Sequence, residues 1–244
     1  LNNYNIGAEE NAIRIGIVGY SKSSGSNESG MTDYTSSTYR NINIENMSVE
    51  VSTANASVAK GFVFAIGSLI GLDADTTQFG EYLEATTPKA IREDIKVSNF
   101  TVNVDVVGGP VFVGGIAGQV NWEIVSYKNC SVSGKVDIAN QGTDLGSYVK
   151  YSLGSVVSVG GIVGGSLKTQ HYIEVLNCKT DVDYAITSEN PQELVNVGKY
   201  LGVVLVPGAE STNLAVLTLT DNTDSSSLTI NNEQETIDND YISR

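Results

Sequence analysis

Apolar and polar residues alternate along several segments of the chain with a period of two. The alternation is clearest in 42–51 and 97–104, and each run is interrupted once, close to an asparagine. A period of two is expected of a strand with one face in the core and the other in water. Val, Ile and Leu supply most of the apolar content, and Gly, Asn, Ser and Thr are frequent, as in strands joined by turns. The sequence therefore predicts an all-β fold.

A short glycine motif recurs along the chain at the end of an apolar strand. Its copies are Gly16-Ile17-Val18-Gly19, Ser68-Leu69-Ile70-Gly71, Gly115-Ile116-Ala117-Gly118, Gly161-Ile162-Val163-Gly164 and a degenerate Gly202-Val203-Val204-Leu205. The last residues of successive copies are 52, 47, 46 and 41 positions apart. Glycine at a tight corner admits positive φ and close approach of neighbouring backbones.

A second motif follows each copy and begins with asparagine. Its instances are Asn46-Met47-Ser48-Val49, Asn99-Phe100-Thr101-Val102, Asn129-Cys130-Ser131-Val132, Asn177-Cys178-Lys179-Thr180 and a looser Asn213-Leu214-Ala215-Val216. Two strand motifs in a fixed order predict units that stack on one another and share a core. We therefore predict a parallel right-handed β-helix, or solenoid, of about five irregular coils with loop insertions. A β-sandwich would also show alternation, but it does not explain the fixed order of the motifs.

The predicted solenoid occupies residues 1–220 as a single domain, and 221–244 is a polar, acidic segment that forms either a C-terminal cap or a tail. The longer insertions fall in 21–39, 72–94, 139–154 and 186–198. Short helices are expected over Phe79–Thr86 and over Pro88–Asp94, where proline suits the first turn. Loops on a rigid stack are where binding function is usually found.

The recurrent asparagines predict a structural ladder, because asparagine tolerates the left-handed region and its amide can bond to the next coil. This ladder comprises Asn46, Asn99, Asn129 and Asn177, with Cys130 and Cys178 beside it. Neighbouring coils would place the two cysteines within reach of a disulfide. Met47 and Phe100 stand at the positions aligned with them, however, which indicates an apolar, inward-facing site. We therefore predict two free, buried cysteines.

Charge and composition exclude several classes of function. The chain has 14 basic and 28 acidic residues, a net charge of −14 and a pI near 4.3. Nucleic acid is therefore not an expected partner, because phosphate contacts need a basic surface. No apolar run approaches the eighteen or so residues of a membrane span, so no transmembrane segment is expected in this chain. The two cysteines have no metal-ligand spacing, and neither a metal nor a cofactor is predicted.

The glycine motif followed by Asn-Cys-x-Val in 113–136, and by Asn-Cys-Lys-Thr in 159–182, resembles the GLUG-type repeat of bacterial surface proteins. The resemblance covers about 13–220. It implies a parallel β-helix in a secreted, adhesin-like protein, at the extracellular or outer cell surface, with its signal or anchor segment outside this chain and a larger parent chain possible. Some surface-anchored immunoglobulin-cleaving peptidases also have this repeat, but their chemistry is not implied, because no His-Glu-x-x-His occurs here.

Aromatic residues in turns and insertions are the candidate ligand contacts, since they stack on sugars and dominate protein hot spots. They are Trp122, Tyr127, Tyr148, Tyr151 and Tyr172. Trp122 could equally cover the edge of the core.

Three functions are compatible with this sequence. The first is an adhesin-like module that binds a glycan or a protein, and the second is a structural stalk or spacer of a larger surface protein. The third is a β-helix lyase or glycosidase, whose acids would come from Asp137, Asp181 and Asp183 at nearby strand positions. No catalytic residue is assigned, because a single histidine, His171, gives no Ser-His-Asp relay. We therefore predict a binding protein and not an enzyme.

Overall fold

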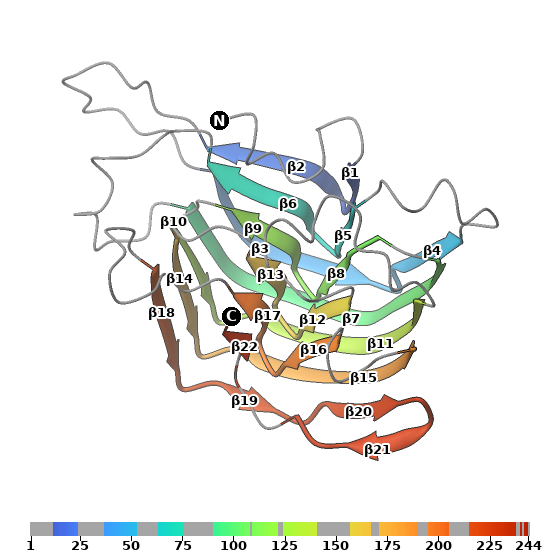
Figure 1. Cartoon of the computed structure of the whole chain (residues 1–244). Coiled ribbons are helices and arrows are strands. Elements are labelled where there is room, and N and C mark those ends of the chain that lie inside the picture. The colour runs from blue at the N-terminus through green and yellow to red at the C-terminus, as the bar shows by residue number, and fades with distance from the viewer. Residues whose placement is uncertain are drawn as a thin grey trace, which may run out of the picture.

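The computed structural model describes residues 12–23, 37–52, 63–75, 90–107, 109–121, 124–140, 157–166, 171–189, 195–204, 215–237, 240 and 242–243. Within these ranges all regular secondary structure is β-strand, so the all-β prediction is confirmed. The strands form three sheets, and almost all of their pairings are parallel (Figure 1).

Each sheet collects strands from along the whole chain. The five-stranded sheet contains, in spatial order, β1 (Ala12–Ile15), β5 (Val63–Gly67), β8 (Val111–Gly114), β12 (Val157–Gly160) and β16 (Val195–Gly198). The six-stranded sheet contains β2 (Val18–Ser23), β6 (Ile70–Asp75), β9 (Ala117–Asn121), β13 (Val163–Ser166), β17 (Leu201–Val204) and β22 (Ile242–Ser243). The eleven-stranded sheet contains β3 (Thr38–Glu45), β4 (Ser48–Ser52), β7 (Ala90–Val106), β10 (Ile124–Lys128), β11 (Ser131–Asn140), β14 (His171–Leu176), β15 (Lys179–Ser188), β18 (Ala215–Thr220), β19 (Thr223–Asp224), β20 (Ser227–Ile230) and β21 (Glu233–Glu235).

The strands divide along the chain into five units, each with strands in all three sheets. Units one to five comprise β1–β4, β5–β7, β8–β11, β12–β15 and β16–β20. In the two smaller sheets the units lie side by side in chain order, and in the largest sheet β7 pairs with β3 and β4 of unit one and with β10 and β11 of unit three. Sequence-adjacent units are therefore neighbours in every sheet.

Two columns of glycine bring the smaller sheets into backbone contact. The first column ends the strands of the five-stranded sheet and contains Gly16, Gly67, Gly114, Gly160 and Gly198. The second lies in the six-stranded sheet and contains Gly19, Gly71, Gly118, Gly164 and Gly202. A Cβ placed on Gly67 would lie 2.6 Å from the amide nitrogen of Gly118, so a larger residue has no room there. This close approach explains the final glycine of the motif and the glycine that directly precedes the motif in copies two to four.

In the first four copies the predicted final glycines do align with one another across the six-stranded sheet. The position of the fifth copy and the alignment of the first glycine in copy one were predicted wrongly. The fifth copy ends at Gly202, because Leu201 pairs with Val163, so it comprises Lys199–Gly202 and not Gly202–Leu205. Gly16 aligns with Gly67, the residue before Ser68, because the turn of unit one is one residue shorter. The error in the fifth copy arose because its sequence is degenerate. The error in the first copy arose because its turn is one residue shorter.

The predicted asparagines do bond to one another between neighbouring strands, but they form two separate columns. Their prediction as a single ladder was therefore wrong. Asn177 Nδ2 donates to Asn129 Oδ1 at 2.9 Å, and Asn129 Nδ2 donates to Asp94 Oδ1 at 3.2 Å. Asn99 Nδ2 donates instead to Asn46 Oδ1 at 3.0 Å, in a separate column. All five residues adopt left-handed backbone conformations, with φ between 51° and 56°. Asn213 lies outside the described residues.

The second column arises from an irregularity that periodicity did not show. Between the paired residues Val132–Val97 and Gly134–Phe100, β7 contains one residue more than β11. Strand β7 therefore has left-handed residues at both Asp94 and Asn99, as unit one has at Asn41 and Asn46. The true equivalents of Cys130 are Ile95 and Ile42, and not Phe100 and Met47.

We expect Asn177→Ala to lower the free energy of unfolding by about 1–2 kcal/mol, because alanine loses the amide bond and disfavours a left-handed backbone. Asn177→Gly keeps the backbone conformation accessible and is expected to cost less than the alanine variant. Urea denaturation of both variants measures the difference. Equal costs would show that the left-handed conformation contributes nothing to the preference for asparagine.

The inward faces of the three sheets form one continuous hydrophobic core. It includes Phe64, Ile66, Phe100, Ile138 and Ile173, all at most 1% exposed. Cys130 and Cys178 are both free and buried, which confirms their prediction. The helix expected over Pro88–Asp94 was wrong where the chain is described, because β7 begins at Ala90. The backbone of β7 pairs in parallel with both β3 and β10. This strand pairing outweighs the tendency of the proline to begin a helix. The other expected helix, Phe79–Thr86, lies outside the described residues.

The acidic C-terminal segment continues two of the sheets. Strands β19 and β20 pair in parallel with β15, β21 folds back antiparallel on β20, and β22 pairs with β17. Figure 1 shows the β20–β21 hairpin at the bottom of the molecule, beyond β15. The last described strand of the eleven-stranded sheet at this end is therefore part of a local hairpin.

Candidate ligand-binding face

The outer face of the eleven-stranded sheet is the broad sheet face that reaches solvent in the described part of the chain. In β7, β11 and β15 buried and accessible residues alternate. In β5, β8, β9, β12 and β13, by contrast, every residue is buried. The five-stranded sheet packs one face on the core and the other on the six-stranded sheet, where the Ser158 hydroxyl donates to Gly164 O at 2.7 Å.

The predicted aromatic contacts have different outcomes. Tyr127 is fully buried and points into the core, so its prediction as a ligand contact was wrong. It lies opposite Arg92 and Val175, which are inward positions of β7 and β14. Tyr172 is half-buried, with the outward parity of its strand. Trp122, Tyr148 and Tyr151 lie outside the described residues.

Tyr172 belongs to a set of polar residues on the outer face that spans four neighbouring strands. The patch, called the Tyr172 patch below, comprises Arg40 on β3, Glu93 on β7, Lys128 on β10, and Tyr172 and Glu174 on β14. Tyr172 OH donates to Glu174 Oε1 at 2.9 Å. Partial burial raises the pKa of Tyr172, and the hydrogen bond and charge of Glu174 act in the same direction. The phenol therefore stays protonated and holds the Glu174 carboxylate as an acceptor.

The other half of the patch is a row of alternating charges. Arg40 Nε lies 2.9 Å from Glu93 Oε2, and Lys128 Nζ lies 3.9 Å from Glu93 Oε1. Arg40, Glu93 and Lys128 occupy the same register position on neighbouring strands. The long side chains of Arg40 and Lys128 are about half exposed, so the row offers donors to a ligand. On β14 the row meets Leu176, four residues along the same strand from Tyr172.

The three aspartates proposed for an enzyme do not stack. Asp137 lies opposite Ala185 and Asn103, while Asp181 lies opposite Ser133 and Asp183 opposite Lys135. In the register of β11 and β15, Asp137 is two positions from Asp183 and four from Asp181, so the three lie near equivalent positions but no two are directly opposite each other. Asp183 Oδ1 instead accepts a hydrogen bond from the Ser227 hydroxyl at 2.5 Å.

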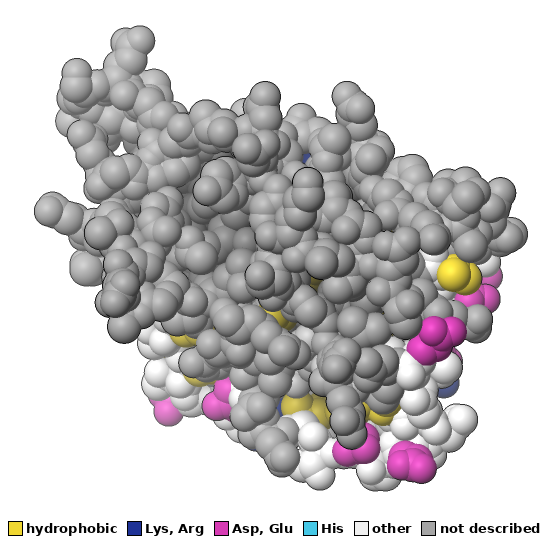
Figure 2. All heavy atoms as spheres, in the orientation of Figure 1, with side chains coloured by type: hydrophobic (Ala, Val, Ile, Leu, Met, Phe, Trp, Pro, Cys, Tyr) yellow, Lys and Arg dark blue, Asp and Glu magenta, His cyan; other side chains and the backbone are white. Residues whose placement is uncertain are grey.

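Acidic side chains are also conspicuous at one margin of the molecule. Figure 2 shows them over the C-terminal ends of the eleven-stranded sheet's strands and over the β20–β21 hairpin. Exposed acidic residues near these ends are Asp105, Asp137, Glu189, Glu233 and Glu235. Among the described residues, no group of three or more histidines, cysteines and carboxylates is arranged to hold a metal ion.

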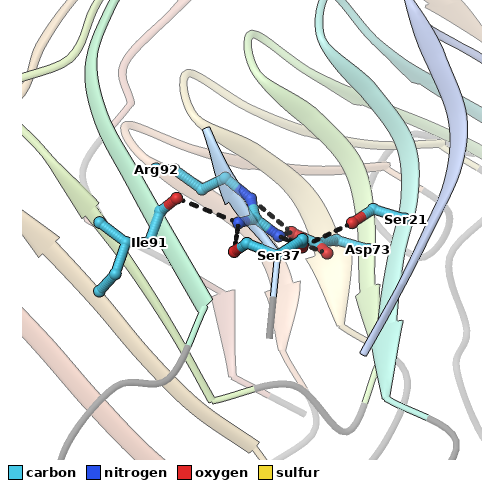
Figure 3. Close-up of polar contacts among 5 residues, drawn as sticks. All are labelled: Ser21, Ser37, Asp73, Ile91 and Arg92. Carbon is cyan, nitrogen blue, oxygen red and sulfur yellow. Dashed lines mark hydrogen bonds and ion pairs between the residues drawn. The ribbon is translucent and has the colours of Figure 1, made fainter. Parts of the chain in front are cut away.

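A buried ion pair lies inside the first two units, and sequence reasoning missed it. Arg92 on β7 donates from Nε and Nη2 to both carboxylate oxygens of Asp73 on β6, at 2.7–3.0 Å. Arg92 Nη1 donates to Ser37 O at 2.6 Å, and its guanidinium lies 4.7 Å from the ring centroid of Tyr39. Figure 3 shows the guanidinium between Asp73 and Ser37, with Ser21 on the far side of the carboxylate.

This cluster is sealed from solvent, because both charged side chains are 0% exposed. Burial raises the pKa of Asp73, while the charge and hydrogen bonds of Arg92 and a hydrogen bond from Ser21 act in the opposite direction. The two charged groups already satisfy each other and the backbone of Ser37, so we assign the pair to the core and not to the candidate site. The signal in the sequence was a charged residue at an inward position of a strand, flanked by Ala90 and Ile95.

No family model matches the chain, and no curated protein or solved structure matches it either. In the described residues, no helix is long and apolar enough to cross a membrane.

Proposed function

We propose that the chain is an adhesin-like binding module of a secreted or cell-surface protein, built as a right-handed parallel β-helix of about five coils. In this proposal the ligand is a glycan or a surface protein, and the Tyr172 patch with the neighbouring insertions contacts it. The observation that carries the proposal is the accessible outer face of the eleven-stranded sheet, with an aromatic ring and paired charges at one end.

The pairing of the units supports the β-helix. Each unit contributes strands to the same three sheets, and sequence-adjacent units pair in parallel through all three. The glycine columns place a close backbone approach between the two smaller sheets at the corresponding position of neighbouring units. These features are also what the resemblance to the GLUG-type repeat implies, and that resemblance supports an origin on a bacterial surface.

The chemistry of the Tyr172 patch supports binding. A tyrosine ring supplies an apolar surface at low entropic cost, and carboxylate, ammonium and guanidinium groups supply hydrogen bonds to hydroxyls or to a protein backbone. A purely structural stalk has no need of such a group on its accessible face. Stacked carboxylates would favour a glycosidase or lyase, and Asp137 has none opposite it on β7 or β15.

A glycan-array screen of the purified protein tests the proposal, with Tyr172→Ala, Trp122→Ala and Thr187→Ala run beside it. We expect a specific glycan to bind and Tyr172→Ala to weaken binding about 10-fold or more, as for aromatic hot spots. Thr187 is an exposed residue near the far end of β15 and serves as the matched control, with no expected loss.

The alternatives give different results. Binding of neither glycans nor candidate surface proteins by the folded protein would favour the stalk. Release of sugar products that stops in Asp137→Asn or Asp181→Asn would favour the enzyme. Binding that survives Tyr172→Ala but is lost in Trp122→Ala would move the contact from the patch to the segment before β10.

A further inference from the structure

Cys130 and Cys178 lie directly opposite each other on units three and four. The register is one-to-one on both sides of them, with Lys128 opposite Leu176 and Ser131 opposite Lys179. Opposed residues on parallel strands are about 4.8 Å apart. This separation falls within the range of about 4.4–6.8 Å between the Cα atoms of a disulfide.

The backbone of Cys130 contacts the thiol of Cys178, while each thiol itself donates to backbone carbonyls, Cys130 to Arg92 O and Lys128 O and Cys178 to Tyr127 O and Leu176 O. The backbone amide of Cys130 donates to Cys178 Sγ at 3.4 Å. A hydrogen bond from the Cys130 thiol lowers the pKa of Cys178, against the opposing effect of burial, and the same bond raises the pKa of Cys130. The pair is asymmetric in geometry as well, because only the Cys178 sulfur accepts a hydrogen bond from the other cysteine's backbone amide, which favours its thiolate and makes it the better nucleophile.

The surrounding backbone holds this arrangement in place. Lys179 N donates to Cys130 O at 2.8 Å, and the side chains of Asn129 and Asn177 are joined next to the thiols. The equivalent positions of units one and two contain Ile42 and Ile95. Isoleucine fills the core at this position, so packing alone does not require two adjacent thiols.

We propose that Cys130 and Cys178 are a redox-active pair that hydrogen peroxide converts into a disulfide joining units three and four. The Cys178 sulfur attacks one peroxide oxygen, the O–O bond breaks, and the departing hydroxide takes the thiol proton to become water. Cys178 is then a sulfenic acid. The Cys130 sulfur attacks the sulfur of Cys178, the S–O bond breaks, and the second hydroxide leaves with the proton of Cys130 as water. Two thiols are oxidised by two electrons, and one peroxide is reduced to two waters.

The first test uses the wild-type chain with equimolar hydrogen peroxide. After denaturation and alkylation, we expect the intact mass to show the loss of two hydrogen atoms and no alkylated cysteine, and peptide mapping to join Cys130 to Cys178. Dithiothreitol is expected to restore both thiols. The oxidised chain is also expected to melt about 5 °C higher, because the crosslink restricts the unfolded chain. Two alkylated cysteines after peroxide treatment, or a disulfide between chains only, would overturn the proposal.

Single variants separate the two roles, once circular dichroism has shown that each retains its strand content. In Cys130→Ser, peroxide is expected to leave a sulfenic acid at Cys178 that dimedone traps. In Cys178→Ser, Cys130 is expected to react with dimedone at least 10-fold less, because it has the raised pKa and no thiol partner. Equal trapping at the two positions would contradict the assigned order of attack.

Discussion

Replacing Arg92 with methionine is expected to lower the free energy of unfolding by about 3–5 kcal/mol, the range for removing one partner of a buried ion pair. The variant leaves the carboxylate of Asp73 without its counter-ion at a position with no access to water. It also removes the donor to Ser37 O and the cation above the Tyr39 ring. Urea denaturation followed by circular dichroism measures the loss.

Two controls make this result specific. Arg40 belongs to the same sheet and pairs with Glu93 while half exposed, so Arg40→Met is expected to cost less than about 1 kcal/mol. The double variant Asp73→Leu/Arg92→Met removes both charges and is expected to recover most of the stability lost in Arg92→Met alone. Similar costs for Arg92→Met and Arg40→Met would show that the buried pair has no special role in stability.

Replacing Gly118 with valine is expected to cost about 3 kcal/mol or more, or to prevent folding. A Cβ at this position would lie 2.6 Å from the carbonyl carbon of Ala65 and 2.8 Å from the carbonyl oxygen of Gly71, and it would also collide with the amide nitrogen of Ile66. All three atoms belong to the backbone of the neighbouring unit, so no rotamer change relieves the overlap. The thermal midpoint and the yield of soluble protein report the effect.

Gly19 provides the matched control, because it stands in the same glycine column on β2, the edge strand of the six-stranded sheet. Among the residues that the structure describes, a Cβ on Gly19 meets only the carbonyl oxygen of Arg14, at 3.5 Å, which is an ordinary contact. Gly19→Ala is therefore expected to change stability by less than about 0.5 kcal/mol. A tolerated Gly118→Val would mean that the two smaller sheets do not approach as closely as their glycine columns indicate.

Much of the fold could be predicted from the sequence, because the period-two alternation of single residues and the repeat of about 45 residues between glycine motifs indicate the same strands. Alternation identified the inward faces, and the glycine motif marked where units repeat. Register was less predictable, since β7 accommodates an extra residue at Asn99 and alternation resumes on either side of it. The alternation of apolar and polar residues looks the same on both sides of the extra residue, so it does not reveal the shift in register. For this reason Asn99 and Asn129 were aligned although they belong to different columns.

The candidate site was less predictable than the fold. Tyr127 and Tyr172 look alike in the sequence, since each lies shortly before an asparagine, but one is an inward and the other an outward position of its strand. The difference in parity shows only when β10 and β14 are placed in register. Arg92 was missed for the opposite reason, because a charged residue is not expected at an inward position unless a distant segment provides its partner. Asp73 is that partner, and sequence alone does not join the two.

The hairpin that ends the eleven-stranded sheet has a consequence for self-assembly. Parallel sheets whose edges stay open invite further copies to add as new strands, and fibres can follow. Here the outermost described strand at one end, β21, has three exposed residues, and Glu233 and Glu235 are two of them. A second copy that approached this edge in an antiparallel pairing would place carboxylates close to carboxylates, and like charges across strands repel. The chain therefore discourages polymerisation at this end through its own charge, while its outer face stays available to a ligand.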